Sequence, residues 1–385
     1  MSGQCDLAVL GGYGDVGHEA SRAWLRLRAL SGADARLRIG GRDLQAAREC
    51  AERLRVSASE SGRAARTITI EAMAVDLFDA ESLRAFVGGS RAVLNCAGPS
   101  HRIGDRVARA TLAAGADYID AAGDDALHAL LDPADYQSSG RRALLSAGMQ
   151  PGLSALLPRW LATHLPRPLR LTSYLGLNDR FTAVAADDYL HGAADGNSEP
   201  LAAWRDRGRR AGASRRQRDT TLPFFNGPVA VLPYLNREGE RLARVLNLRD
   251  GDWHSAIEGR HVLAAFDRAH ALPREEAIAL LRHASALDLA GRRPTATLLC
   301  QLDGENSSVS VLLRAPGNAA LSGGFAAVAV QAALSESIAP GRHYAAMAMD
   351  PAGSLQALRD CGAVEVLNRF DGPLPCEALT EEGAL

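Results

Sequence analysis

Three glycines near the N-terminus constrain the fold of this chain more than any other feature of its sequence. Gly12, Gly14 and Gly17 lie in the stretch LAVLGGYGDVGHEASRAWL, residues 7–25, behind a short apolar run and ahead of a segment with helical spacing. A glycine-rich turn that joins a buried strand to the start of a helix is typical of a dinucleotide phosphate site. Gly12 permits the tight turn, Gly14 lets the backbone approach a pyrophosphate, and Gly17 lets the helix pack closely on the strand.

The residues between these glycines belong to the same predicted cofactor site, which therefore includes Tyr13, Asp15 and Val16. We expect Tyr13 to lie over the pyrophosphate side of the site and Asp15 to cap the start of the helix. The helix N-terminus supplies free N–H groups and a partial positive charge for the phosphates. A glycine-rich structural turn without a ligand is the alternative interpretation.

Strand-like and helix-like segments alternate regularly over the first part of the chain. Such alternation predicts an α/β fold with a doubly wound parallel sheet of the Rossmann type, because buried parallel strands have continuous apolar runs. The apolar runs are residues 6–11, 35–40, 68–75, 91–95, 116–120 and 142–146, and the helical segments are 16–30, 43–55, 80–87, 102–115 and 125–139.

The pattern changes after SAGMQPGLSALL, residues 146–157, which reads as a turn and a helix start. We predict three parts: a Rossmann-type nucleotide-binding domain over 1–150, a second α/β domain over 151–318, and C-terminal helices over 319–385. The last part is expected to return to the first domain and to end in a mobile tail after residue 371. In the second part we expect a strand at 169–177, a hairpin of strands 294–303 and 307–314, and a solvated loop at the basic segment 205–218.

The end of the second predicted strand favours NADP(H) over NAD(H). Sites specific for NAD carry an acidic residue there, which binds the ribose 2′-hydroxyl. This chain has IGGRD, so glycines fill the acidic position and Arg42 follows. A guanidinium can bind a 2′-phosphate through two parallel hydrogen bonds.

Two further segments follow predicted strands and are expected to contact the cofactor. Asp76 comes just after the third strand, near the expected adenine edge, and the small residues NCAGP follow the fourth strand, beside the expected nicotinamide ribose. This second segment consists of Asn95, Cys96, Ala97, Gly98 and Pro99.

Charge and composition exclude several other classes of protein. The formal net charge of −2 gives no basic field for nucleic acid or anionic membranes, and no apolar run is long enough for a membrane span. The N-terminus has no signal-peptide pattern, so a cytoplasmic protein is expected.

The six cysteines are not spaced as metal ligands or as a disulfide framework, so no metal site is expected. All 43 basic residues are arginine, which excludes any lysine proton donor or Schiff base.

Five segments in this order and spacing resemble the saccharopine dehydrogenase-like oxidoreductases: VLGGYGDVG, IGGRD, NCAGP, AGADYIDAAGD and GMQPGLSALL. The resemblance covers residues 7–157, weakens from 170 to 315, and returns faintly around PGRHYAAMAMD, residues 340–350. It implies a Rossmann domain, NADP(H), chemistry at carbon–nitrogen bonds, and a second domain whose sheet often forms a homodimer interface.

Within this family, the overall build is similar to thiazolinyl imine reductases of siderophore biosynthesis. Those enzymes reduce a thiazoline ring to a thiazolidine on a carrier-bound, pyochelin-like intermediate, so this resemblance implies an imine substrate that is a small molecule or tethered to a carrier protein. A saccharopine or opine-type amino acid dehydrogenase, an accessory enoyl reductase, and a non-enzymatic NADP-binding protein are the alternatives. The absence of lysine and of an obvious arginine pattern for a dicarboxylate argues against saccharopine itself as the substrate.

Three residues are candidates for the proton donor that imine reduction needs. His101 directly follows the NCAGPS segment, and an imidazole can exchange a proton near neutral pH. Asp120 and Tyr118 lie at the carboxyl end of the fifth strand, where functional side chains of open α/β sheets gather. Simpler roles are a helix start for His101, loop capping for Asp120 and packing for Tyr118, and a bound water could also give the proton. Substrate contacts are expected from the GMQPG turn through Gly148, Gln150 and Pro151.

Overall fold

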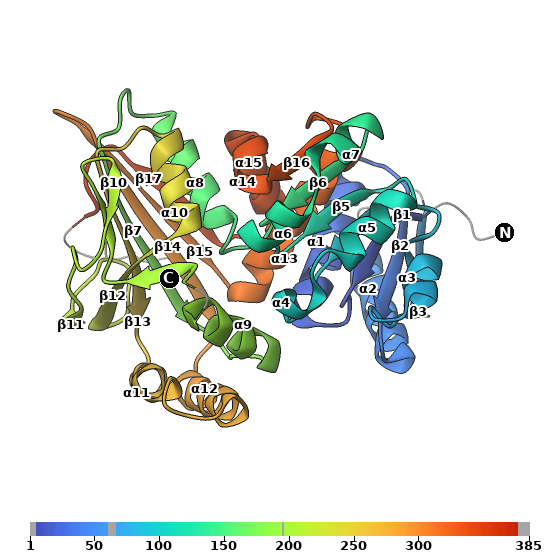
Figure 1. Cartoon of the computed structure of the whole chain (residues 1–385), viewed down its shortest axis with the longest axis horizontal. Coiled ribbons are helices and arrows are strands. Elements are labelled where there is room, and N and C mark those ends of the chain that lie inside the picture. The colour runs from blue at the N-terminus through green and yellow to red at the C-terminus, as the bar shows by residue number, and fades with distance from the viewer. Residues whose placement is uncertain (1–4, 61–66, 195, 376–385) are drawn as a thin grey trace. The chain divides into compact units, whose positions relative to one another are not determined.

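The computed structural model describes residues 5–60, 67–194 and 196–375. The chain divides into two compact units (Figure 1). The first unit contains the residues up to 156 together with 318–364, and the second contains 157–317 and the residues from 365 onward. The chain therefore leaves the first unit once and later re-enters it.

A seven-stranded sheet with only parallel pairings forms the centre of the first unit, as the alternating sequence pattern predicts. Its strand order is β16-β6-β5-β4-β1-β2-β3. The strands are β1 (Cys5–Leu10), β2 (Ala35–Gly41), β3 (Ile68–Ala74), β4 (Ser90–Asn95), β5 (Asp117–Asp120), β6 (Arg142–Leu145) and β16 (Gly341–Tyr344).

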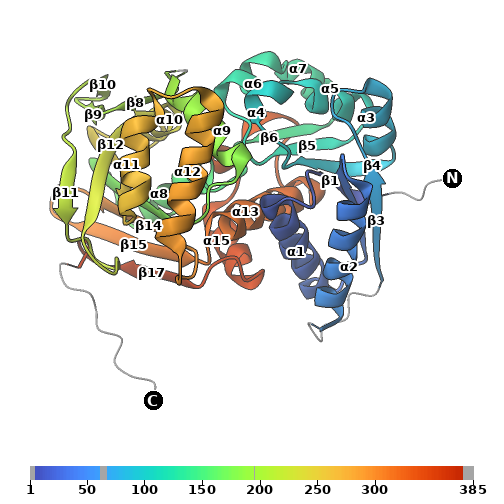
Figure 2. The same ribbon diagram turned by 90° about the horizontal axis from the view of Figure 1, so that it is seen from below.

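Helices cover both faces of this sheet. In Figure 2, α1, α2 and α13 lie on one face, and α3, α5, α6 and α7 lie on the other. The helices of this unit are α1 (Asp15–Leu30), α2 (Leu44–Glu60), α3 (Ala80–Val87), α4 (Ser100–Ile103), α5 (Arg106–Ala113), α6 (Asp125–Leu130), α7 (Pro133–Ser138), α13 (Asn318–Leu334), α14 (Ala345–Ala348) and α15 (Pro351–Asp360).

Two segments expected to be single helices are each broken into two. The segment 102–115 is interrupted at Gly104, which has a φ of 60° and so leaves the helical region of the backbone. The segment 125–139 is interrupted before Pro133, whose missing N–H suits the first position of a new helix. Asp132 caps that new helix by accepting from Ala134 N at 2.9 Å.

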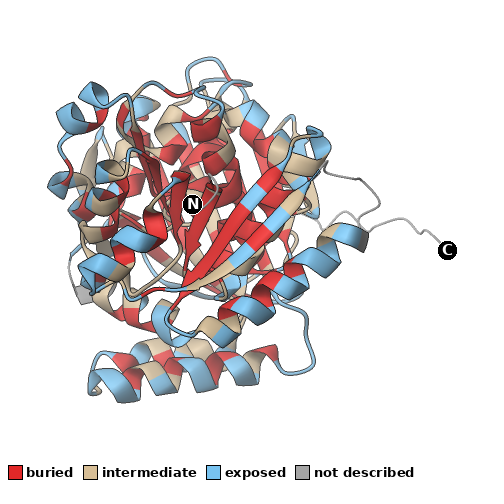
Figure 3. Ribbon diagram, turned by 90° about the vertical axis from the view of Figure 1, so that its right-hand side faces the viewer, coloured by how far each residue is buried: buried red, intermediate tan, exposed pale blue. Residues whose placement is uncertain are grey.

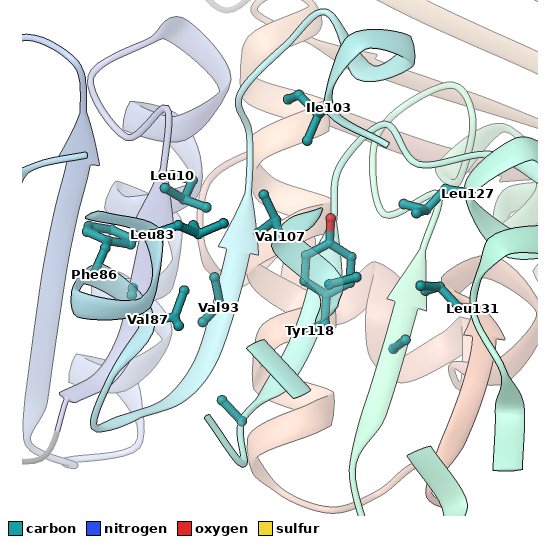
Figure 4. Packing of buried hydrophobic residues seen from close by; sticks show 14 of the residues in the cluster. Leu10, Leu83, Phe86, Val87, Val93, Ile103, Val107, Tyr118, Leu127 and Leu131 are labelled. Carbon is teal, nitrogen blue, oxygen red and sulfur yellow. The ribbon is translucent and has the colours of Figure 1, made fainter. Parts of the chain in front are cut away.

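The apolar core on one face of the parallel sheet forms from strand residues and from helices α3 to α7 (Figure 4). Leu10, Val93 and Tyr118 come from the strands, and Phe86 and Val107 pack on them from helices. Figure 3 shows this division on the helices at the surface, with buried residues on the side toward the sheet and exposed residues on the other side. This amphipathic spacing is what allowed the helices to be predicted.

Helix α13 is apolar on almost all sides and packs against α1 and strands β4 to β6. The contact with α1 is close because the facing position is Gly323. A Cβ atom there would lie 2.5 Å from Ala20 N and 2.8 Å from Val16 O. The C-terminal helices α13 and α15 therefore belong to the first unit, whereas the residues from 365 onward belong to the second.

A ten-stranded mixed sheet forms the centre of the second unit. Strands β7 and β13 pair in parallel, and all its other pairings are antiparallel, including the predicted hairpin of β14 and β15. The strands are β7 (Arg170–Asn178), β8 (Ser198–Pro200), β9 (Ala203–Arg205), β10 (Gly208–Arg210), β11 (Gln217–Thr220), β12 (Val229–Asn236), β13 (Asp250–Ile257), β14 (Thr295–Asp303), β15 (Ser308–Ala315) and β17 (Val366–Phe370).

In the described ranges, five helices accompany this second sheet, and α8 carries the chain into the unit. Helices α9, α11 and α12 share an apolar cluster of their own, which includes Leu190 and Leu281. Asp288 of α12 caps α11 by accepting from His261 N at 3.2 Å and Val262 N at 2.8 Å. The helices are α8 (Leu153–Ala162), α9 (Ala183–Ala194), α10 (Arg237–Val245), α11 (Arg260–Ala269) and α12 (Arg274–Leu289).

The expectation of a solvated loop over the basic segment 205–218 is wrong in part. Strand β10 lies within it, and β9 and β11 overlap its ends. Its arginines are partly neutralised, since Arg209 pairs with Glu199 at 2.9 Å and with Glu240, and Arg216 pairs with Asp267 at 2.8 Å. Ion pairs of this kind let a strongly charged segment take part in a sheet.

The expected mobile tail falls mostly outside the described residues, which end at 375. Within the described part, Leu374 N donates a hydrogen bond to Gln301 Oε1 at 2.8 Å. The five described cysteines are all free thiols, and Cys376 lies outside the described residues.

Candidate cofactor site

The predicted site residues of the first unit gather at one edge of its sheet. Because every strand of that sheet runs in the same direction, the segments that follow the strands meet at the carboxyl edge. The glycine turn follows β1, Arg42 follows β2, Asn95 ends β4 and Asp120 ends β5. This is the edge at which open α/β sheets bind their ligands.

The glycine turn closes in a way that only glycine permits. A Cβ at Gly17 would overlap the Gly11 carbonyl oxygen and lie 2.7 Å from Gly12 Cα. A Cβ at Gly12 would lie 2.9 Å from Ile39 Cγ2. The turn therefore lies close to both β2 and α1, as a pyrophosphate-binding turn requires.

Sequence reasoning missed one glycine of this turn. Gly11 has a φ of 66°, and a Cβ there would lie 2.8 Å from Ala97 N, so the turn and the NCAGP segment approach each other backbone to backbone. The doubled glycine at the end of the strand was the available signal.

The start of α1 suits an anionic ligand, but the expected cap is wrong. The N-cap residue is Gly14, no described side chain caps it, and Asp15 is instead the first helical residue and is exposed. Val16 follows it and is half-buried. A helix start without a side-chain cap leaves backbone N–H groups for the phosphates of a cofactor.

The side chain of Tyr13 lies beside the end of β2. A Cβ added at Gly41 would overlap its ring and lie 2.8 Å from its Cζ, and its hydroxyl accepts from Asp43 N at 3.3 Å. This contact corrects the expectation that Tyr13 lies over the pyrophosphate, because the ring is held at the position that distinguishes NAD from NADP. Arg42 is exposed and makes no hydrogen bond or ion pair with the described residues.

Asp76 is exposed in the turn after β3 and uses its carboxylate locally. Its Oδ1 accepts from Phe78 N at 2.9 Å, and its backbone N donates to Ser82 Oγ at 3.1 Å. The carboxylate therefore shapes the turn at the expected adenine edge.

A buried cluster of polar side chains joins the ends of β4 and β5. Asn95 Nδ2 donates to Asp120 Oδ2 at 3.0 Å, and the hydroxyl of Tyr118 donates to the same oxygen. The other carboxylate oxygen accepts from Ala122 N at 2.9 Å and Gly123 N at 2.7 Å. Asp120 thus accepts from four donors and ties together the two loops that follow β4 and β5.

Burial removes Tyr118 and Asp120 from the set of groups placed to protonate a substrate. Their relative exposures are 0% and 3%. Burial, and then the charge of Asp120, raise the pKa of Tyr118 well above its usual value, so the phenol stays protonated and donates to Asp120. Both residues hold the loops in position, which corrects their expected role as proton donors.

The NCAGP segment is held by this cluster. Ala97 N donates to Asn95 Oδ1 at 3.1 Å, so the Asn95 side chain is directed inward and is not available to a ribose. The pKa of the Cys96 thiol is raised by burial and by the charge of Asp120, so this thiol stays protonated. Gly98 and Pro99 complete the segment, and Pro99 is the N-cap residue of α4.

His101 lies in α4, directly after this segment, and its side chain is exposed. Of the three expected proton donors it is the one whose side chain reaches the surface at the carboxyl edge of the sheet.

The predicted substrate-contact turn is compact and is tied to α13. A Cβ at Gly148 would overlap the carbonyl oxygen of Ala121, and Gly148 N donates to Pro151 O at 3.2 Å. Met149 N donates to Ser322 Oγ at 3.1 Å, whereas Gln150 is half-buried. The turn therefore lies next to the loop that follows β5.

One cluster at this edge was not predicted from the sequence. Tyr344 ends β16, its hydroxyl donates to Asp125 Oδ1, and its ring stacks on His128 with 4.3 Å between ring centroids. The faint family resemblance around residues 340–350 was the available signal, but no residue could be chosen from it.

The described residues include no group of three or more His, Cys, Asp or Glu side chains that could hold a metal ion. None of the helices in the described ranges is long and apolar enough to cross a membrane.

Comparison with known proteins agrees with this geometry. Residues 7–143 match the family model of the saccharopine dehydrogenase NADP binding domain. The first unit therefore contains an NADP(H)-binding domain of this type, which confirms the cofactor prediction and, for these residues, the family resemblance. No curated protein matches the chain in sequence.

A solved structure shows the same fold over nearly the whole chain. Apo histidine-tagged saccharopine dehydrogenase (L-Glu forming) from Saccharomyces cerevisiae is similar with a TM-score of 0.64 at 14% identity, covering 96% of this chain and 100% of that one. GenD2 from gentamicin A biosynthesis in complex with NAD is similar with a TM-score of 0.44 at 13% identity, covering 97% and 98%. A probable dehydrogenase from Thermotoga maritima has a TM-score of 0.44 at 10% identity, covering 92% and 94%. Fold and family model together define an oxidoreductase fold of the saccharopine dehydrogenase type.

Proposed function

We propose that this protein is an NADPH-dependent reductase of a carbon–nitrogen double bond. The proposal rests mainly on one observation. An NADP(H)-binding domain of the saccharopine dehydrogenase type has an exposed imidazole, His101, at the carboxyl edge of its sheet. The name of that family denotes chemistry at a carbon–nitrogen bond. The best candidate substrate is the thiazoline ring of a carrier-bound siderophore intermediate, which would be reduced to a thiazolidine.

The residues of the chain have separable tasks in this reaction. NADPH, when bound, supplies the hydride that the imine carbon accepts. The uncapped start of α1 binds the pyrophosphate, and Arg42 binds the 2′-phosphate. The cluster of Asp120, Tyr118 and Asn95 keeps the NCAGP segment in one position, so that reacting groups are oriented before the reaction begins.

His101 delivers the proton that the imine nitrogen needs. The chain contains no lysine, and the buried Tyr118 donates its hydroxyl proton in a hydrogen bond to Asp120, so neither group competes with the imidazole for this role. General acid catalysis by a positioned side chain contributes roughly a hundredfold or more to rate. A His101→Gln variant should therefore lose turnover while keeping its NADPH affinity.

The test compares three substrate classes side by side. NADPH oxidation is measured with cyclic imines, including a thiazolinyl thioester, and with enoyl thioesters. NADP⁺ reduction is measured with amino acids of the saccharopine or opine type. Turnover of the imines supports the proposal. Turnover of only the enoyl or only the amino acid substrates would replace it with the corresponding alternative. Tight NADPH binding without turnover of any of them would favour a non-enzymatic role.

The protein is also proposed to act as a homodimer on a small-molecule or carrier-tethered imine. The dimer rests on the family resemblance, in which the sheet of the second domain often forms the interface. Light scattering on the purified protein tests it, and a monomeric mass at micromolar concentration would contradict it.

A further inference from the structure

The surroundings of Arg42 assign a further role to Tyr13. We propose that Tyr13 sets the preference for NADP(H) over NAD(H), by occupying the place of an NAD-specific acidic side chain and by positioning the backbone that carries Arg42. The proposal depends on the NADP(H)-binding domain and is independent of the substrate proposed above.

Tyr13 leaves no room for a side chain at Gly41, the last residue of β2. In NAD-specific sites an acidic side chain projects from this end of the second strand to bind the ribose hydroxyls. Here a side chain at residue 41 would meet the ring of Tyr13, since its Cβ would overlap Cε1 and lie 2.8 Å from Cζ. While Tyr13 keeps this position, an acidic residue at 41 has no room.

Tyr13 also holds the short connection from β2 to α2. Only Arg42 and Asp43 separate Gly41 from Leu44, the first residue of the helix. Asp43 caps that helix, since its Oδ1 accepts from Gln45 N at 2.9 Å and Ala46 N at 3.1 Å. The backbone N of Asp43 donates to the hydroxyl of Tyr13 at 3.3 Å.

Tyr13 therefore contacts the residues on both sides of Arg42: its ring lies on Gly41 and its hydroxyl holds Asp43. The guanidinium of Arg42 is exposed and forms no hydrogen bond with the described residues, so it is available to a ligand. A backbone fixed on both sides reduces the conformational entropy that this side chain loses when it binds a phosphate. Tyr13 is thus a positioning residue that acts through Arg42.

If Tyr13 acts through Arg42, substitutions at these two residues should have non-additive effects on NADPH affinity. A tyrosine that only stabilises the glycine turn would not show this coupling. If Tyr13 positions Arg42, its effect on NADPH affinity must disappear once the guanidinium is removed. If Tyr13 only stabilises the glycine turn, its substitution must weaken NADPH and NADH equally, with or without Arg42. A double-mutant cycle on cofactor affinity separates these cases.

The experiment measures dissociation constants for NADPH and NADH by fluorescence titration in four proteins: wild type, Tyr13→Phe, Arg42→Ala and the double variant. Tyr13→Phe should weaken NADPH binding by about fivefold, the size expected for one lost hydrogen bond, and leave NADH within about twofold. In the Arg42→Ala background it should change NADPH binding by less than about twofold. Equal losses for both cofactors, or additive losses in the double variant, would overturn the positioning role.

A second pair of variants tests the occupied place at residue 41. Gly41→Asp alone should weaken both cofactors, because the new side chain and the tyrosine ring compete for one position. Gly41→Asp combined with Tyr13→Ala should bind NADH about tenfold more tightly than Gly41→Asp alone, since an acidic residue can then reach the ribose. If the single variant gains NADH affinity as fully as the double variant, the ring does not exclude the acid. Thermal melts of every variant establish that it is folded, and no result depends on imine turnover.

Discussion

Both units of the molecule bury carboxylates, and two of these, Asp120 in the first unit and Asp252 in the second, have different kinds of partner. In the first unit, Asp120 is 3% exposed and accepts only from uncharged donors: two backbone N–H groups, an amide and a phenol. In the second unit, Asp252 is 5% exposed and accepts from two guanidinium groups, Arg170 at 2.8 Å and Arg205 at 2.5 Å, and from the hydroxyl of Ser214 at 3.1 Å.

The positions of these partners explain the difference. The donors to Asp120 come from β4, from β5 and from the loop after β5, so this carboxylate fixes the loops at the edge that holds the cofactor-site residues. The two arginine partners of Asp252 come from β7 and β9, which pair with its own strand β13. The ion pairs of Asp252 link neighbouring strands and so stabilise the second sheet. The short, rigid donors around Asp120 instead fix the position of loops. Substitutions should therefore separate function from stability in the two units.

The largest effect is expected from Asp120→Ala. This change leaves four donors without their acceptor in a buried place, which should destabilise the fold by about 3 kcal/mol. The NCAGP segment would lose its anchor, so NADPH affinity should fall at least about tenfold. Urea unfolding and NADPH titration check the two effects, with Asp132→Ala, which removes only a local helix cap, as the matched control. An NADPH affinity that stays unchanged would show that the cluster does not support the cofactor site.

Asp252→Asn should affect stability alone. It weakens two ion pairs of the second sheet, which should cost about 2 kcal/mol at neutral pH while NADPH affinity stays unchanged. Thermal melting and the same cofactor titration test this expectation. A substantial loss of NADPH affinity would contradict the assignment of Asp252 to the fold.

The pH dependence sharpens this test. Burial acts to raise the pKa of Asp252, but the hydrogen bonds and charges of Arg205 and Arg170 outweigh it and lower the pKa below its usual value. The ion pairs therefore stabilise the fold fully above the unfolded pKa of about 4, and this stability is lost as the pH falls from there through the lower folded pKa. Melting temperatures between neutral pH and pH 3 should fall more steeply for the wild type than for Asp252→Asn.

Arg42→Ala should lower NADPH affinity without lowering the stability of the fold. Its total effect should be smaller than that of Asp120→Ala, which is expected to lower both. Loss of a guanidinium that binds the 2′-phosphate should weaken NADPH by roughly tenfold and leave NADH nearly unchanged. Stability should stay within about 0.5 kcal/mol, because Arg42 is exposed. Unchanged affinity for both cofactors would remove Arg42 from the site.

The smallest effect is expected from the basic segment of the second unit. The side chains of Arg210, Arg215 and Arg218 are exposed there and make no hydrogen bond or ion pair with the described residues, so they are available to an acidic carrier protein. Their joint replacement by glutamine should raise KM for a carrier-bound substrate about threefold and leave KM for a free analogue unchanged. Arg207→Gln is the control, since Arg207 already donates to Asn247 Oδ1. Equal changes for both substrates would argue against carrier docking.

The sequence allowed the first unit to be predicted in detail because local pattern and tertiary role agree there. Its strands are buried apolar runs and its helices have one apolar face, so the boundaries of β1, β4 and α3 lie within one residue of expectation. Most of the expected site residues follow from topology as well, since each comes after a strand of a parallel sheet.

Much of the second unit could not be predicted, because its short strands have no apolar pattern. β8, β10 and β11 contain three or four mostly polar residues, and ion pairs such as Arg209 with Glu199 stabilise them. The partners in such pairs are chosen by the tertiary structure. The errors at Tyr13 and Asp15 have a related cause, since the direction of a side chain depends on neighbours such as Gly41 that the motif does not specify.

The discontinuity of the first unit has a consequence for biosynthesis. When the ribosome has released residues up to 156, strand β6 still has an unpaired edge, because β16 begins only at residue 341. The apolar surface that α13 covers, on α1 and on β4 to β6, is also open until residue 334 has been made. The nascent N-terminal segment therefore carries an exposed strand edge and an apolar face throughout synthesis of the second unit, which makes it a client for chaperones during translation.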